Sequence, residues 1–179
     1  MQNRYFIAIT LPSRISKFIS NVQDELLAEY MTNHNVMQPL VPHITLLHPN
    51  VLETLPPDHF LPKVKHSTDS IFPIQINFES IDSFEQRVMH IDVNSPHLYE
   101  LQTKLVGLLP ARVRAQYLVG RPYKAHITLA QVKPKQNLPA ELIKNLTSKI
   151  EPILPCSFEA TELVCFKWIR PRTYEVRKI

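Results

Sequence analysis

The chain has 179 residues, of which 44% are hydrophobic and 20% charged, a balance typical of one globular domain. It contains 16 prolines but only two glycines, Gly107 and Gly120. Phosphate-binding loops of the glycine-rich type need several glycines close together so that the backbone can approach the anion. This composition therefore excludes a P-loop nucleoside triphosphatase and an oxidoreductase with a glycine-rich dinucleotide-binding motif.

Charge is distributed unevenly along the chain. Residues 1–100 carry six Lys/Arg and 11 Asp/Glu, whereas residues 101–179 carry 14 and five. A basic segment of this kind favours an anionic partner such as nucleic acid or a nucleotide. The alternative is a basic surface that only keeps the protein in solution.

Targeting signals and cysteines carry little information here. No basic flank precedes an apolar run of secretory length, and no stretch reaches the roughly 18 consecutive apolar residues of a membrane span. Cys156 and Cys165 lie nine positions apart, a spacing typical of neither a zinc knuckle nor a redox pair. We expect a cytoplasmic monomer with reduced thiols and no membrane partner, metal or cofactor.

The periodicity of apolar residues predicts the secondary structure in chain order. Helices are predicted at 13–30, 96–109 and 139–150, and a proline-rich loop at 49–62. Strands are predicted at 4–11, 41–48, 73–84, 87–94, 123–132, 158–169 and 173–178, with a hairpin turn before the last. This order predicts an α+β fold with mainly antiparallel sheets.

One tetrapeptide, His-Ile-Thr-Leu, occurs twice, at residues 43–46 and 126–129. The alternating segments 5–9 and 89–93 also repeat, at an offset of 84 positions, and each is followed by a proline. Two copies of a strand–helix–strand unit explain this pattern. We therefore expect one domain with intertwined lobes, a pseudo-twofold axis, antiparallel sheets lining a central cleft and helices outside. The domain covers residues 1–179, with approximate repeats 4–86 and 87–179.

Both copies of the tetrapeptide lie on predicted strands. Because side chains alternate along a strand, His43 shares one face with Thr45, and His126 shares one with Thr128. Near neutral pH one imidazole can accept a proton while the other donates one. Hydroxyl groups can bind the phosphate oxygens on which charge develops. The four residues predict phosphodiester chemistry without a metal ion.

The chain resembles the 2H phosphoesterases, in the branch of bacterial 2′-5′ RNA ligases and RNA 2′,3′-cyclic phosphodiesterases. The resemblance rests on RYFIAITLP at 4–12, PHITLLHP at 42–49 and RPYKAHITLA at 121–130, and covers essentially the whole chain. It implies a bilobal α+β fold, no metal, and a phosphodiester of RNA type as substrate. It also implies that His43 donates a proton and His126 accepts one, a division that could be reversed. Ala125 departs from the family, in which proline often precedes the second histidine.

Three further residues are candidates for substrate binding. Arg121 could hold a phosphate with its guanidinium, although an ordinary surface arginine explains it equally well. Tyr123 lies just before the second motif and need not share its face. Phe6 could stack on a base or could simply fill the core.

The alternation of side chains along the predicted strand 87–94 also places His90 and Asp92 toward the expected cleft. They take the positions of Phe6 and Ala8 in the first repeat. Histidines on neighbouring strands could bind zinc, but no usual ligand spacing is present. We give these residues no catalytic role.

The sequence therefore predicts a metal-independent phosphoesterase that opens 2′,3′-cyclic phosphates of RNA ends or related nucleotides to 2′-phosphates, and that could join 2′-5′ ends in reverse. One alternative is a phosphodiesterase for small cyclic nucleotides of the ADP-ribose type. A second alternative is a non-catalytic RNA- or nucleotide-binding module with the same basic cleft. The sequence does not distinguish the substrates of the two enzymes.

Overall fold

The computed structural model describes residues 5–33, 36, 41–118, 122–170 and 173–179. Its strands are β1 (Tyr5–Thr10), β2 (His43–Leu47), β3 (Ile74–Phe84), β4 (Val88–Asn94), β5 (His126–Gln131), β6 (Ser157–Ala160), β7 (Val164–Arg170) and β8 (Thr173–Lys178). Its α-helices are α1 (Ser13–Asn33), α2 (Pro49–Leu52), α3 (Pro57–Thr68), α4 (Pro96–Gly107), α5 (Ala111–Leu118) and α6 (Ala140–Ile150). The fold is α+β, as predicted. In the described part of the chain, no helix is both long and apolar enough to cross a membrane.

The strands form one eight-stranded sheet in the order β6-β3-β4-β5-β2-β1-β7-β8. Every neighbouring pair is antiparallel. The two strands that carry the repeated tetrapeptide, β2 and β5, lie at its centre and pair through Ile44 and Ile127. The expected separate sheets are thus joined edge to edge by the two motif strands.

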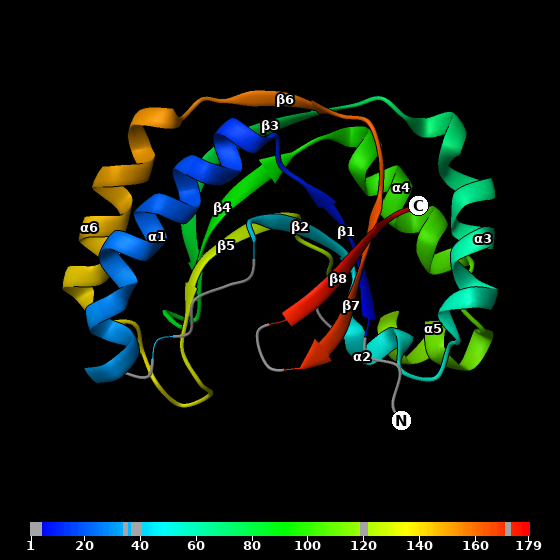
Figure 1. Ribbon diagram of the computed structural model, residues 1–179, viewed down its shortest axis with the longest axis horizontal. Helices are drawn as coiled ribbons and strands as arrows, with labels where there is room; N and C mark the ends of the chain where they lie inside the picture. Colours follow the sequence, from blue (N-terminus) through cyan, green and yellow to red (C-terminus); the bar gives the residue numbers. More distant parts are fainter. Residues whose placement is uncertain (1–4, 34–35, 37–40, 119–121, 171–172) are drawn as a thin grey trace.

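Each half of the sheet combines strands from both sequence repeats. β3, in the repeat 4–86, pairs with β4 of the repeat 87–179, and β7, in the repeat 87–179, pairs with β1 of the repeat 4–86 (Figure 1). The predicted strand at 158–169 is therefore wrong as a single element, because it is divided into β6 and β7. β6 pairs with β3 and β7 with β1, in opposite halves of the sheet.

Helices cover one face of the sheet and build the main core. α1 packs on β5 and α6 at one end of the molecule, and α4 packs on β2, β3 and α3 at the other (Figure 1). On α4 the side chains Leu98, Leu101 and Leu105 recur every three or four residues and are fully buried, as expected for the core-facing side of a helix. Ser95 caps this helix by accepting a hydrogen bond from the N–H of Leu98.

The proline-rich segment 49–62 was predicted as a loop, and this prediction is wrong. Pro49 and Pro57 stand at the first positions of α2 and α3, where proline loses no intrahelical hydrogen bond because the first N–H groups have no partner. Pro62 lies inside α3. A further helix, α5, occupies a region without a predicted element. The predicted hairpin turn at 170–173 contains residues 171–172, which lie outside the described residues.

The ladder registers also correct the alignment of the two repeats. Ala8 pairs with Thr45 and Thr10 with His43 on one side, whereas His90 pairs with Thr128 and Asp92 with His126 on the other. His90 therefore takes the place of Ala8 and not that of Phe6. Because the correction is by two residues, the side chains stay on the face that alternation predicted.

Candidate active site

The two central strands divide their side chains between the core and the opposite face of the sheet. Ile44 and Ile127 are completely buried in the helix-covered core. The alternate residues are half-buried on the opposite face, which we call the site face; they are His43, Thr45, His126 and Thr128. Because the strands run antiparallel through the pair Ile44–Ile127, His43 lies on the same side of this pair as Thr128, and His126 as Thr45. The motifs are thus arranged around a local pseudo-twofold axis.

Both motif histidines are held in the same way. The Nδ1 atom of His43 lies 2.8 Å from the carbonyl oxygen of Val41, and that of His126 lies 2.7 Å from the carbonyl oxygen of Lys124. A carbonyl oxygen only accepts hydrogen bonds, so Nδ1 carries the proton in each ring. Nε2 is then the nitrogen left to exchange a proton with another molecule.

Burial lowers the pKa of both histidines, since it disfavours the charged imidazolium. The hydrogen bonds to Val41 and Lys124 partly oppose this effect. His126 also lowers the pKa of His43 by charge repulsion. Both rings are therefore neutral at pH 7 in the free protein, and an anion bound between them would favour protonation of one.

The surroundings of His43 are aromatic and apolar. Its ring centroid lies 5.1 Å from that of Phe6 and 5.4 Å from that of Phe166, and these two phenyl rings stack at 4.8 Å. Together with Ala8 and Val164 they form a small apolar cluster, separate from the main core. This cluster lies on the site face, on β1 and β7.

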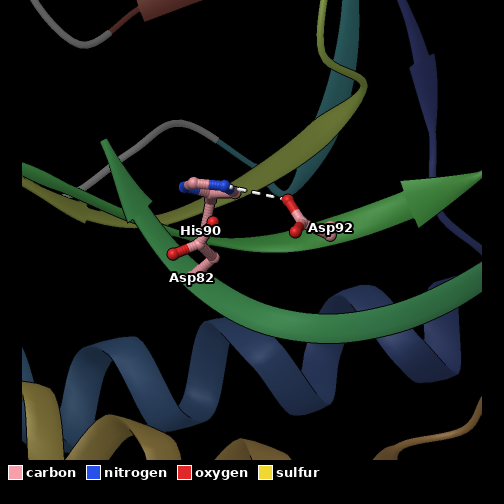
Figure 2. Close-up of side chains that lie close together, drawn as sticks. All are labelled: Asp82, His90 and Asp92. Atoms are coloured by element: carbon pink, nitrogen blue, oxygen red, sulfur yellow. Dashed lines mark ion pairs between the residues drawn. The ribbon is translucent and has the colours of Figure 1, made fainter. Parts of the chain in front are cut away.

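The surroundings of His126 contain one aromatic ring and several polar or charged side chains. The His126 ring meets the rings of Phe84 and His90 edge to face, at centroid distances of 5.0 and 5.2 Å. The side chain of His90 is completely buried, and its Nε2 lies 2.9 Å from Oδ1 of Asp92. Figure 2 shows these two side chains on β4 with Asp82 beside them on β3.

Lys124 forms ion pairs with the two carboxylates of this cluster. Its Nζ lies 2.9 Å from Asp92 and 3.0 Å from Asp82, and Ser80 donates a hydrogen bond to Asp92. Asp82, His90 and Asp92 have one potential ligand atom each within 4.8 Å of one another, so they could hold a metal ion. The ammonium group already supplies a positive charge there, and a divalent cation would have to compete with it.

The other predicted binding residues have different positions. Phe6 is only 5% exposed and contacts His43 as described above. The hydroxyl of Tyr123 donates a hydrogen bond to the carbonyl oxygen of Thr45, so this side chain links the approach to β5 with β2. Arg121 lies outside the described residues.

Several neighbours of the histidines were not identified from the sequence. Asp82, Phe84 and Phe166 come from strands that are distant in the chain from the histidine they approach, and Lys124 lies two residues before His126. Gln23 on α1 was also missed; it is buried and its Nε2 donates to the carbonyl oxygen of Leu129 on β5. Only the spacing of His90 and Asp92 gave a signal, because alternation placed both on the site face.

The fold and the site define a protein built around two equivalent His-x-Thr strands at the centre of one antiparallel sheet. The family model for the 2′-5′ RNA ligase superfamily matches residues 11–172. The chain therefore belongs to the 2′-5′ RNA ligase superfamily, a group of 2H phosphoesterases. Among curated proteins, no sequence matches the chain.

Solved structures share the fold at low sequence identity. TT0787 of Thermus thermophilus is 16% identical with a TM-score of 0.63, and the match covers 98% of this chain and 94% of that one. Escherichia coli LigT complexed with NADP+ is 16% identical with a TM-score of 0.61, over 99% and 95% of the two chains. LigT complexed with 3′-AMP has a TM-score of 0.60 at 16% identity, over 100% and 96%. These likenesses establish the fold.

Proposed function

We propose that this protein is a metal-independent phosphoesterase that opens 2′,3′-cyclic phosphates of RNA ends or related nucleotides to 2′-phosphates. The observation that carries the proposal is the equivalent pair of histidines on the two central strands, each with Nδ1 bound to a backbone carbonyl. Two neutral imidazoles with Nε2 available suit proton transfer to and from oxygen. The family membership and the solved complex of LigT with 3′-AMP support a nucleotide substrate.

In the proposed reaction, water attacks the phosphorus atom and His126 Nε2 accepts a proton from it. The bond between phosphorus and O3′ breaks, and His43, protonated when the anionic substrate binds, donates its proton to O3′. The products are a 2′-phosphate and a 3′-hydroxyl. The Thr45 and Thr128 hydroxyls bind the non-bridging oxygens, where negative charge increases in the transition state. With the 5′-hydroxyl of a second RNA in place of water, the same attack on phosphorus and loss of O3′ joins the two RNAs by a 2′-5′ bond.

The test is turnover of a short RNA that ends in a 2′,3′-cyclic phosphate, with EDTA present. We expect His43→Ala and His126→Ala each to lower kcat by about 10²–10⁴-fold, the usual contribution of a general acid or base. His97→Ala is a matched control, because His97 is exposed at the start of α4, and it should retain activity. Turnover that survives in the folded double variant His43→Ala/His126→Ala would exclude the proposed mechanism.

A further inference from the structure

The two halves of the site face differ at equivalent positions. Ala8 pairs with Val164 in the half that contains His43, and His90 pairs with Asp82 in the half that contains His126. Small apolar residues thus stand where the other half has an imidazole and a carboxylate. A substrate with one flat apolar part and one polar part can therefore bind in only one of the two orientations that the pseudo-twofold axis would allow.

A cavity of ≈ 290 Å³ continues the apolar half beyond His43. It is lined by Phe6, Pro49, Asn50, Glu53, Trp168 and Tyr174. Trp168 and Tyr174 are cross-strand neighbours on β7 and β8, and the indole is 37% exposed. Because Phe6 lies against both His43 and this cavity, a group bound in the cavity would lie next to the imidazole.

The chemistry of the lining fits a nucleobase. Aromatic rings offer faces on which a base can stack, and stacking does not depend strongly on the identity of the base. The polar groups lie on one side, since Asn50 and Glu53 both belong to α2 and its C-cap. A carboxylate only accepts hydrogen bonds, so it favours a base that presents an amino group and disfavours one that presents an oxygen atom. Cytosine has an amino group at the position where uracil has a carbonyl oxygen.

We infer that this cavity is a base-binding subsite, and that Glu53 makes it select amino-bearing bases over uracil. The inference rests on the proposed function, because the bound base belongs to the nucleotide whose cyclic phosphate is opened. In this arrangement the base lies on the His43 side, and the charged cluster around His126 faces the sugar-phosphate part of the substrate. Trp168 and Tyr174 supply affinity, and Glu53 supplies the selection.

The experiment compares cytidine and uridine 2′,3′-cyclic phosphates, which differ only in the base edge. The wild type should show a kcat/KM about tenfold higher for the cytidine compound, the discrimination expected of one good base contact. Glu53→Gln should bring this ratio close to one, because an amide can both donate and accept. Glu175→Gln is the matched control on the neighbouring strand β8, and it should keep the wild-type ratio.

Stacking is tested separately with Trp168→Ala. This variant should lower kcat/KM for both nucleotides by about fivefold to 100-fold, and Trp168→Phe should restore most of the loss. An abasic ribose 2′,3′-cyclic phosphate should be opened equally well by wild type and Trp168→Ala. If the wild type opens the abasic compound but treats cytidine and uridine alike, or if Glu53→Gln keeps the ratio, the subsite is wrong and the proposed function stands. If the wild type opens neither these three compounds nor a short RNA that ends in a 2′,3′-cyclic phosphate, the proposed function itself fails.

Discussion

At the scale of single residues, the two motif histidines are equivalent in their own contacts but not in their neighbours. Each ring is held by the carbonyl two residues earlier. Among the described residues, a carboxylate shifts the pKa of His126 but not that of His43: Asp92 raises the pKa of His126, whereas His90 and Lys124 lower it. The proposed division between acid and base can therefore be tested by changing Asp92 alone.

We expect Asp92→Asn to lower the pKa of His126. The substitution removes the negative charge that favours the imidazolium, and it leaves the positive charge of Lys124 less compensated. If His126 is the general base, it stays neutral to lower pH, so the acidic limb of the pH profile of kcat/KM moves down. Activity at the optimum should change by less than about tenfold, or 1.4 kcal/mol.

The control for this profile is Asp58→Asn, because Asp58 is an exposed residue near the start of α3 and should leave both limbs unchanged. A downward shift of the basic limb in Asp92→Asn would mean that His126 is the acid. An unchanged profile would mean that Asp92 does not influence His126 at all.

At the scale of elements, the hairpin between β3 and β4 positions the polar half of the site face. Glu85 and Gln86 both have a φ of 54°, and the N–H of Arg87 bonds to the carbonyl of Phe84 at 2.9 Å to close the turn. The left-handed region is unfavourable for residues with a Cβ atom, and such turns usually contain Asn-Gly or Asp-Gly. This chain forms the turn without glycine.

Gln86→Gly should therefore raise the free energy of unfolding by about 1 kcal/mol, because glycine adopts positive φ without steric cost. Urea unfolding measures this change as a higher midpoint at an unchanged slope. Gln136→Gly is the comparison, since Gln136 is not among the described residues with positive φ; it should lower stability or leave it unchanged. Equal effects at both positions would contradict the strain argument.

At the scale of the whole molecule, folding brings the acidic and basic parts of the chain together. Lys149 on α6 lies 2.9 Å from Glu25 on α1, and Lys124 pairs with Asp82 and Asp92. Basic residues of the second half also lie on α5 and α6, at opposite ends of the sheet (Figure 1). Among the described residues, the basic side chains of the second half of the chain therefore do not form one continuous surface.

This arrangement predicts a weak dependence of activity on salt. With one or two phosphate contacts, an increase from 50 to 200 mM salt should lower kcat/KM for an RNA end by roughly threefold to sevenfold. A protein that followed a long RNA with six or more cationic contacts would lose about 10³-fold or more. The measurement is kcat/KM against salt for a dinucleotide and a 20-mer; a much steeper slope for the longer RNA would show an extended basic surface.

Local pattern was sufficient for most of the fold. Alternation placed His43, Thr45, His126 and Thr128 opposite the core, and helical spacing identified the buried stripe of α4. The segment 49–62 was wrongly predicted as a loop because proline is common both in loops and at the first position of a helix, so proline content alone does not distinguish them. The segment 158–169 was wrongly predicted as one strand. Alternation of side chains indicates extended structure, but it does not show that the two parts of the segment pair with different strands.

The sequence by itself determined that each motif histidine shares a strand face with a threonine and that this face lies opposite the core. This follows because successive side chains along a strand point to alternate faces. Only the tertiary structure decided what surrounds each histidine. β3 and β7 cross to the opposite halves of the sheet, and they bring Asp82 and Phe84 toward His126 and Phe166 toward His43. Those contacts depend on strand order and register, which arise from packing between distant segments and not from the local alternation of residues.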